Sequence, residues 1–261
     1  MASAIIGGLI GNGLPASHIT VVEPFAAARE ALQHKFGLSA VASADDAATA
    51  LQQAQLVVWA VKPQTFKDAA APVAPHTAHA LHLSVAAGIP TPSIAQWLGT
   101  SRIVRAMPNT PALVGKGMTG LYARPEVDAD GQALIARVIG TTGALVWVDA
   151  EDKLDAVTAL SGSGPAYVFL FMEAMTQAGV DMGLTAEQAY QLSVATFQGA
   201  SELAARSDEP ASTLRERVTS KGGTTYAAIT HMQATGIPEH FIAALRKAET
   251  RAQELAAEFG R

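Results

Sequence analysis

The 261-residue sequence contains no cysteine. This absence excludes disulfide bonds, zinc ribbons and thiol nucleophiles together, and it is compatible with a reducing cytoplasm. Charged residues are also scarce, at 16%, and acidic residues outnumber basic ones to give a net charge of −5. Because a nucleic-acid-binding protein needs a basic face, this balance argues against that class of partner.

Long apolar segments and a basic N-terminus are missing too. No run reaches the ~18 apolar residues of a membrane-spanning helix, and the most apolar window, residues 166–172, ends at Glu173. No Lys or Arg precedes Arg29, whereas a secretory signal peptide begins with positive charge. We therefore expect a cytoplasmic protein with no membrane partner. Hydrophobic residues make up 49% of the chain, which favours a folded core over disorder.

The first 150 residues alternate between strand-like and helix-like patterns, which predicts a parallel, doubly wound (Rossmann-like) α/β sheet. Short β-branched runs mark the expected strands at residues 19–22, 56–61, 81–86, 103–106 and 145–148. Ala-rich stretches predict helices at residues 25–36, 45–53 and 127–139. The run 56–61 is apolar throughout, as in a strand covered on both faces.

Beyond residue 150 only helical patterns occur. We therefore expect a dinucleotide-binding domain at residues 1–150 and an all-helical domain at residues 151–261. The helix after Pro165 is apolar nearly all round, which requires burial on every side. A second subunit is the favoured cover, and the first domain is the alternative. Apolar residues in the segment 241–259 form a seam that suits another helix.

The start of the chain departs from a complete dinucleotide-binding fold. Residues 4–10 have the pattern of an amphipathic helix, and no strand or Gly-rich pyrophosphate turn precedes them. The pattern predicts a first domain without its first strand. Because that strand is central in such a sheet, we expect the chain as written to bind a nicotinamide cofactor poorly and to be unstable in its first domain. Upstream residues are expected to restore both.

Two kinds of position at expected strand ends suit a cofactor. Glu23 follows the strand 19–22, where an acidic residue takes the adenosine ribose hydroxyls of NAD. A solvated turn carboxylate is the alternative. The strings Ala60-Val61-Lys62-Pro63 and Ala86-Ala87-Gly88 follow the next two strands, where small residues and a loop at the ligand edge allow cofactor contact. Plain strand-to-helix turns are the alternative there.

Two further clusters differ in what they indicate. Ser220-Lys221-Gly222-Gly223-Thr224-Thr225 opens a helix with paired glycines and consecutive hydroxyls, a pattern typical of carboxylate or phosphate sites. An ordinary helix cap is the alternative. His76, His79 and His82 resemble a metal tract, but no cysteine and no nearby carboxylate accompany them. We expect no metal site there and a solvated loop.

Four strings, taken in order, carry a specific resemblance. They are Ala60-Val61-Lys62-Pro63-Gln64, Arg105-Ala106-Met107-Pro108-Asn109-Thr110-Pro111, Ser161-Gly162-Ser163-Gly164-Pro165-Ala166-Tyr167 and Ser220-Lys221-Gly222-Gly223-Thr224-Thr225. With these strings, the chain resembles pyrroline-5-carboxylate reductase over essentially its whole length. The resemblance implies a Rossmann domain and a helical domain interwoven in a homodimer or larger ring. It also implies reduction of 1-pyrroline-5-carboxylate to L-proline, the last step of proline biosynthesis, usually with NADPH.

The resemblance also implies roles for individual residues. Those expected to contact the cofactor are Ala60, Val61, Lys62, Pro63, Ala86, Ala87 and Gly88, with Met107, Pro108 and Asn109 near the nicotinamide. Those expected to hold the substrate carboxylate are Ser220, Gly222, Gly223, Thr224 and Thr225, with the catalytic Thr225 hydroxyl near the ring nitrogen. Family habit favours NADPH, whereas Glu23 disfavours its 2′-phosphate. We therefore expect use of NADPH together with NADH.

Two departures and two rival functions accompany the resemblance. The family's opening strand and Gly-x-Gly-Asn-Met turn are absent, and Lys221 stands where many relatives have Pro. A 3-hydroxyacid dehydrogenase shares the two-domain plan, but resembles a family with a Lys on the long helix, and here no Lys lies between Lys153 and Lys221. A non-catalytic helical dimer is the other alternative. The missing Gly-rich turn favours it, and the intact 220–225 string opposes it.

Overall fold

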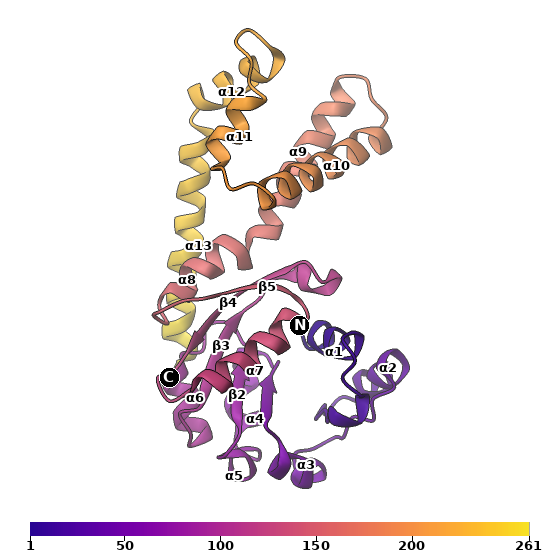
Figure 1. The fold of residues 1–261 in the computed structure, drawn as a ribbon, viewed down its shortest axis with the longest axis vertical. Helices are drawn as coiled ribbons and strands as arrows, with labels where there is room; N and C mark the ends of the chain where they lie inside the picture. Colours follow the sequence, from indigo (N-terminus) through magenta and orange to yellow (C-terminus); the bar gives the residue numbers. More distant parts are fainter. Residues whose placement is uncertain (261) are drawn as a thin grey trace. The chain divides into compact units, whose positions relative to one another are not determined.

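A computed structural model describes residues 1–260, and packing divides the chain into two units. The first unit contains Met1–Ser163 together with the residues from Ala248 onward, and the second contains Gly164–Lys247. Each unit is described by itself. The sequence-based border after residue 150 precedes this division. The last helix, α13 (Ile237–Phe259), contributes residues to both units (Figure 1).

A five-stranded sheet forms the centre of the first unit, with the strand order β1-β2-β3-β4-β5. The strands are β1 (Leu56–Trp59), β2 (Leu81–Ser84), β3 (Ile103–Met107), β4 (Gly117–Ala123) and β5 (Gly143–Trp147). β1, β2 and β3 are parallel, β4 is antiparallel to β3, and β5 is parallel to β4. The expectation of a purely parallel sheet is therefore wrong at β3–β4, and β4 itself was not predicted.

Helices cover both faces of this sheet, which confirms the doubly wound α/β architecture (Figure 1). They are α1 (Ala2–Gly11), α2 (Ala26–Phe36), α3 (Ala48–Gln53), α4 (Phe66–Ala70), α5 (Ala74–Thr77), α6 (Thr91–Leu98), α7 (Ala129–Gly140) and α8 (Lys153–Val157). Ile5 of α1 and Ile135 of α7 belong to one buried cluster. Phe66 of α4, Ile94 of α6 and Phe259 of α13 belong to the other. The predicted helix at residues 4–10 is confirmed as α1.

The strand predicted at residues 19–22 is wrong. This segment makes only an isolated parallel bridge between Val22 and Val41 and does not join the five-stranded sheet. Two backbone hydrogen bonds accompany the bridge, from Glu23 N to the Val41 carbonyl and from Val41 N to the Val21 carbonyl, each 2.9 Å long. A β-branched run becomes a strand only where a neighbouring strand supplies a continuous ladder of partners.

The second unit consists of helices, as predicted. They are α9 (Gly164–Asp181), α10 (Ala186–Ala205), α11 (Ala211–Arg217), α12 (Thr224–Ala234) and the first half of α13. α9 and α10 pack along each other, and Phe241 of α13 makes edge contacts with Tyr167 and Phe171, each with a ring-centroid distance of 5.7 Å. None of the helices within residues 1–260 is long and apolar enough to cross a membrane.

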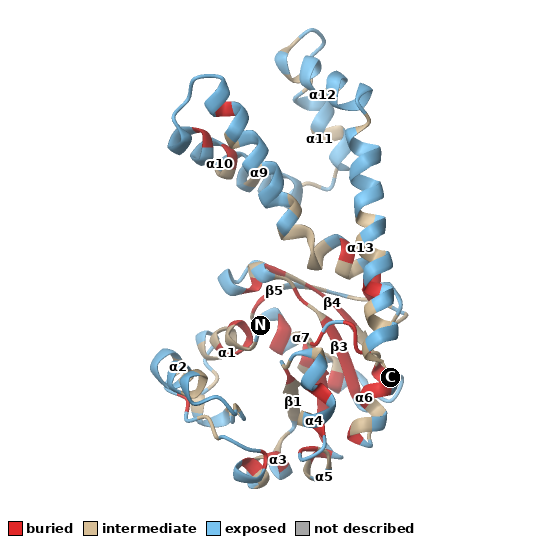
Figure 2. Cartoon of the chain, turned by 180° about the vertical axis from the view of Figure 1, so that it is seen from behind, coloured by how far each residue is buried: buried red, intermediate tan, exposed pale blue. Residues whose placement is uncertain are grey.

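Much of the apolar surface of α9 is exposed in the single chain. Phe169 and Leu170 are 56% and 62% exposed, although the sequence predicts burial of this helix on all sides. Figure 2 shows α9 and α10 as mainly exposed, in contrast to the buried strands of the first unit. Exposed apolar side chains in such number mark a protein–protein interface.

His82 is fully buried on β2 rather than in a solvated loop, so that expectation is wrong for this residue. Its Nδ1 accepts a hydrogen bond from the Trp59 indole N–H at 3.0 Å. Because an indole can only donate, Nδ1 must be unprotonated, and the protonated Nε2 donates to the Thr77 carbonyl at 3.1 Å. Within residues 1–260 no group of His, Asp and Glu side chains is arranged to hold a metal ion.

Acid is therefore expected to destabilise the protein through His82. Burial lowers the pKa of this imidazole below its usual 6.5, with a contribution from the charge of His79. The unfolded chain then binds a proton that the folded protein refuses, so the free energy of unfolding falls as the pH drops below about 6.5, by up to ~1.4 kcal/mol per pH unit. Urea denaturation followed by circular dichroism between pH 7.5 and 5 measures this slope.

The control separates His82 from other histidines. His82→Gln should flatten the slope, whereas His34→Gln, which changes an exposed histidine on α2, should leave it unchanged. A slope that persists in the His82 variant would contradict the assignment.

Candidate active site

Three of the predicted cofactor loops lie at one edge of the sheet. β1, β2 and β3 are hydrogen-bonded parallel neighbours, so the loops 60–63, 86–88 and 107–109 all leave their carboxyl ends on the same side. Lys62 and Ala87 are exposed there. In open α/β sheets this edge is where ligands bind.

Gly88 has a more specific task than the sequence suggests. Its φ of +77° lies in the left-handed region, which favours glycine. A Cβ at this position would lie 3.3 Å from Leu255 Cβ and 3.2 Å from the Phe259 ring, both on α13. The small side chain therefore lets the C-terminal helix pack against the loop at the sheet edge.

Asn109 ties the end of β3 to two neighbouring segments. Its Nδ2 donates to the Ser161 carbonyl at 3.1 Å, and its Oδ1 accepts from the Met118 backbone N–H at 2.9 Å. Ser161 lies in a π-helical turn, Thr158–Gly162, a rare conformation that often marks a functional site. A Cβ at Gly162 would lie only 2.6 Å from Met107 Cε, so this turn packs closely on the end of β3.

A buried ion pair lies one step before this loop on β3. Arg105, which is 5% exposed, donates from Nη1 to Oε1 of Glu151 at 3.1 Å. The same carboxylate accepts the Thr91 backbone N–H at 2.7 Å and the Thr91 hydroxyl at 2.5 Å, at the start of α6. Burial raises the pKa of the nearby Asp155 carboxyl, and the charge of Arg105 opposes that rise. Sequence reasoning missed this cluster, although an arginine inside an apolar strand signals a buried acidic partner.

Glu23 lies apart from the three loops, in the turn before α2. Its Oε1 accepts the Phe25 backbone N–H at 3.0 Å. Arg29, one turn into α2, donates from Nη1 to the Glu23 and Pro24 carbonyls at 2.9 and 2.8 Å. The turn thus carries a carboxylate and a guanidinium side by side.

The string 220–225 forms a tight turn before α12, in the second unit. Gly222 has a φ of +78°, and the Gly223 N–H bonds to the Ser220 carbonyl at 3.0 Å. Gly223 is the N-cap and provides no side-chain hydrogen bond, so the first N–H groups of α12 remain available to an anion. Thr225 is half-buried in the first turn of this helix.

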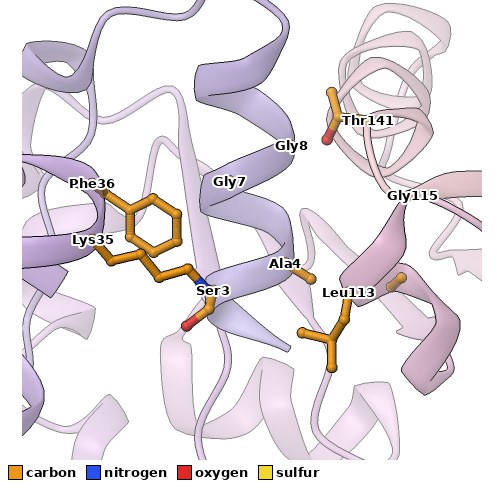
Figure 3. Close-up of a pocket in the computed structure, with 10 residues that line it drawn as sticks. Ser3, Ala4, Gly7, Gly8, Lys35, Phe36, Leu113, Gly115 and Thr141 are labelled. Carbon is orange, nitrogen blue, oxygen red and sulfur yellow. The ribbon is translucent and has the colours of Figure 1, made fainter. Parts of the chain in front are cut away.

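A surface cavity of about 290 Å³ lies over α1, away from the predicted site residues. It is lined by Ser3, Ala4, Gly7, Gly8, Lys35, Phe36, Ala112, Leu113, Gly115 and Thr141. Figure 3 shows the Lys35 side chain extending toward Ser3 and Leu113 on the other side of α1. A Cβ at Gly8 would lie 2.5 Å from Thr141 Oγ1, so glycine here lets α1 approach the end of α7.

Two family models cover most of the chain. Residues 1–88 match the model described as NADP oxidoreductase, coenzyme F420-dependent, and residues 151–255 match the model for pyrroline-5-carboxylate reductase dimerisation. The pyrroline-5-carboxylate reductase of Pseudomonas aeruginosa is 43% identical, with 100% of this chain and 95% of that protein covered. The enzyme of the same name from Glycine max is 35% identical over 98% of this chain and 92% of that protein.

Solved structures agree with the sequence relatives. A pyrroline-5-carboxylate reductase from Coxiella burnetii superimposes with a TM-score of 0.90 at 39% identity and covers 98% of this chain and 94% of its own. Pyrroline carboxylate reductase from Plasmodium falciparum, with NADP bound, has a TM-score of 0.81 at 25% identity and covers 98% and 96%. The family expected from the four strings is thereby confirmed, and the chain belongs to the pyrroline-5-carboxylate reductase family.

Proposed function

We propose that this protein reduces 1-pyrroline-5-carboxylate to L-proline with hydride from NADPH. The observation that carries the proposal is the 43% identity to a pyrroline-5-carboxylate reductase across the whole chain. The three loops at the sheet edge and the intact 220–225 turn support it, because they suit a dinucleotide and a carboxylate respectively.

The cofactor loops fit a nicotinamide dinucleotide by their chemistry. Small side chains at Ala60, Ala86 and Ala87 keep the backbone at the carboxyl edge accessible, and Met107 is half-buried at the end of β3. NADPH supplies the hydride when bound. The NADP model match and the NADP-bound relative support NADP as the cofactor, while the additional use of NADH stays a prediction.

The substrate carboxylate is assigned to the N-terminus of α12. Its free N–H groups and the positive end of the helix dipole attract an anion, and Ser220 and Thr224 place hydroxyls at the same turn. Exposed Lys221 adds a cation, where many relatives have Pro. We assign the Thr225 hydroxyl to the ring nitrogen of the substrate.

The reaction asks little acid–base chemistry of the protein. A cyclic imine can react already protonated, so hydride adds to an electrophilic carbon while the C=N electrons move to nitrogen and form the secondary amine. Reduction of a ketone would instead create an alkoxide, which needs a proton donor. Hydroxyls and backbone N–H groups therefore suffice for this substrate.

The helical unit is assigned to a homodimer. The match of residues 151–255 to a dimerisation model agrees with the exposed apolar side chains of α9. A second copy is the partner that covers them. The cytoplasmic location and any larger ring stay predictions.

The test is substrate choice in the full-length enzyme, including any coding sequence that precedes Met1. NADPH oxidation followed by absorbance should depend on 1-pyrroline-5-carboxylate, and chromatography should identify proline as the product. The matched control replaces the cyclic imine with 3-oxo acids, which should not be reduced. An enzyme that reduced the 3-oxo acids and ignored the imine would contradict the proposal.

A further inference from the structure

The turn between Glu23 and Arg29 holds two opposite charges that contact the backbone rather than each other. Oε1 of Glu23 accepts the N–H of Phe25 at 3.0 Å. Arg29 bonds instead to the carbonyls of Glu23 and Pro24. The carboxylate is thus tethered to its own turn, and the guanidinium is docked beneath it without being neutralised by it.

The geometry leaves part of the Arg29 side chain for a ligand. Both of its hydrogen bonds use Nη1, at 2.9 and 2.8 Å, and no other acceptor within residues 1–260 bonds to this guanidinium. The Nε and Nη2 donors remain. Two parallel donors of a planar guanidinium match two oxygens of a phosphate, and such charge-assisted pairs are about twice as strong as neutral ones.

The place of this turn in the fold identifies the ligand group. Glu23 comes directly after Val22, which pairs in parallel with Val41, and the turn leads into α2. In dinucleotide-binding domains the residue at this position faces the adenosine ribose, where NADP carries a 2′-phosphate and NAD a hydroxyl. A carboxylate at this position disfavours the phosphate, so NADP use requires a compensating cation.

We infer that Arg29 is the residue that selects NADP(H), by binding the 2′-phosphate beside a Glu23 carboxylate held back by Phe25 N–H. The inference rests on the proposed function, since it concerns the cofactor of that reaction. Arg29 also supports the turn through the two carbonyls, so the test must separate binding of the 2′-phosphate from maintenance of the turn.

Calorimetric binding to the full-length enzyme separates them. Arg29→Ala should raise the Kd of NADP⁺ and of adenosine 2′,5′-bisphosphate by about 10- to 100-fold. The Kd of NAD⁺ and of 5′-AMP, which lack the 2′-phosphate, should change less than about threefold. Arg29→Lys, which keeps a cation able to bond the two carbonyls, should fall between the variant and the unmodified enzyme. Glu23→Ser should lower the Kd of NADP⁺ more than that of NAD⁺.

The control is Arg206→Ala, which removes an exposed arginine paired with Glu202 in the other unit and should alter neither Kd. An equal rise for NADP⁺ and NAD⁺ in Arg29→Ala would overturn the inference and leave Arg29 as a support of the turn. Unchanged binding of both would overturn it as well. An unmodified enzyme that bound neither nucleotide would overturn the proposed function and this inference with it.

Discussion

Replacing Thr225 by valine is expected to lower the kcat of proline formation by about 100-fold while the fold persists. Valine keeps the shape of threonine and removes only the hydroxyl that we assign to the substrate nitrogen. Loss of one hydrogen-bonding group aimed at a reacting centre costs ~10²-fold or more in kcat. Gly223, not Thr225, is the N-cap of α12, and no capping hydrogen bond is lost with the hydroxyl.

Steady-state kinetics on purified enzyme measure this effect, with circular dichroism as the check on folding. Thr225→Ser keeps a hydroxyl and should restore most of the kcat. The matched control is Thr230→Val, which makes the same change at an exposed position of the same helix. Unchanged kinetics in the Thr225 valine variant would limit Thr225 to a structural part of α12. A rise in KM alone would assign the hydroxyl to substrate binding rather than to the transition state.

Removing the Glu151 carboxylate is expected to destabilise the first unit by about 3–5 kcal/mol. Arg105 is nearly inaccessible to water, and Glu151 neutralises it while accepting two hydrogen bonds from Thr91. Glu151→Ala leaves the guanidinium charge buried without a partner and leaves the start of α6 without its acceptor. The change is a large part of the ~5–15 kcal/mol that holds a typical domain together.

Chemical denaturation gives the free energy of unfolding for this comparison. Glu151→Leu combined with Arg105→Met removes both charges and should recover part of the loss, because no unpaired ion remains. Glu202→Gln breaks an exposed ion pair with Arg206 and should change the free energy of unfolding by less than about 0.5 kcal/mol. A loss below about 1 kcal/mol for Glu151→Ala would show that water reaches Arg105 and compensates for the missing carboxylate.

The strands at 56–59, 81–84 and 103–107 and the helices α2 and α7 follow from local pattern. Continuous apolar runs and 3.6-residue periodicity are properties of neighbouring residues, so they can be read without the tertiary structure. The same holds for the change to helices alone in the second half. The 60–63 and 220–225 strings could likewise be placed at a strand end and a helix start, since both depend on residues next to one another.

β4 was missed because its pattern serves a contact elsewhere. Gly117 and Gly120 weaken the strand signal, but a Cβ at Gly120 would lie 2.6 Å from Val157 Cγ1 of α8. An isolated glycine in a strand often marks such a close approach, and this was the available signal. The nine residues 108–116 between β3 and β4 also explain the antiparallel pairing, because a parallel crossover needs a dozen or more.

By itself, the sequence determined the α/β and all-helical halves, most of the elements and the strings that identify the family. Tertiary structure alone decided that residues 19–22 make one bridge rather than a strand, that His82 is buried, and that Glu151 neutralises Arg105. Each of these depends on a partner distant in the chain, such as Val41, Trp59 or Arg105. Secondary-structure propensity describes what a segment can form, whereas strand pairing, burial and charge neutralisation are decided by what folding brings beside it.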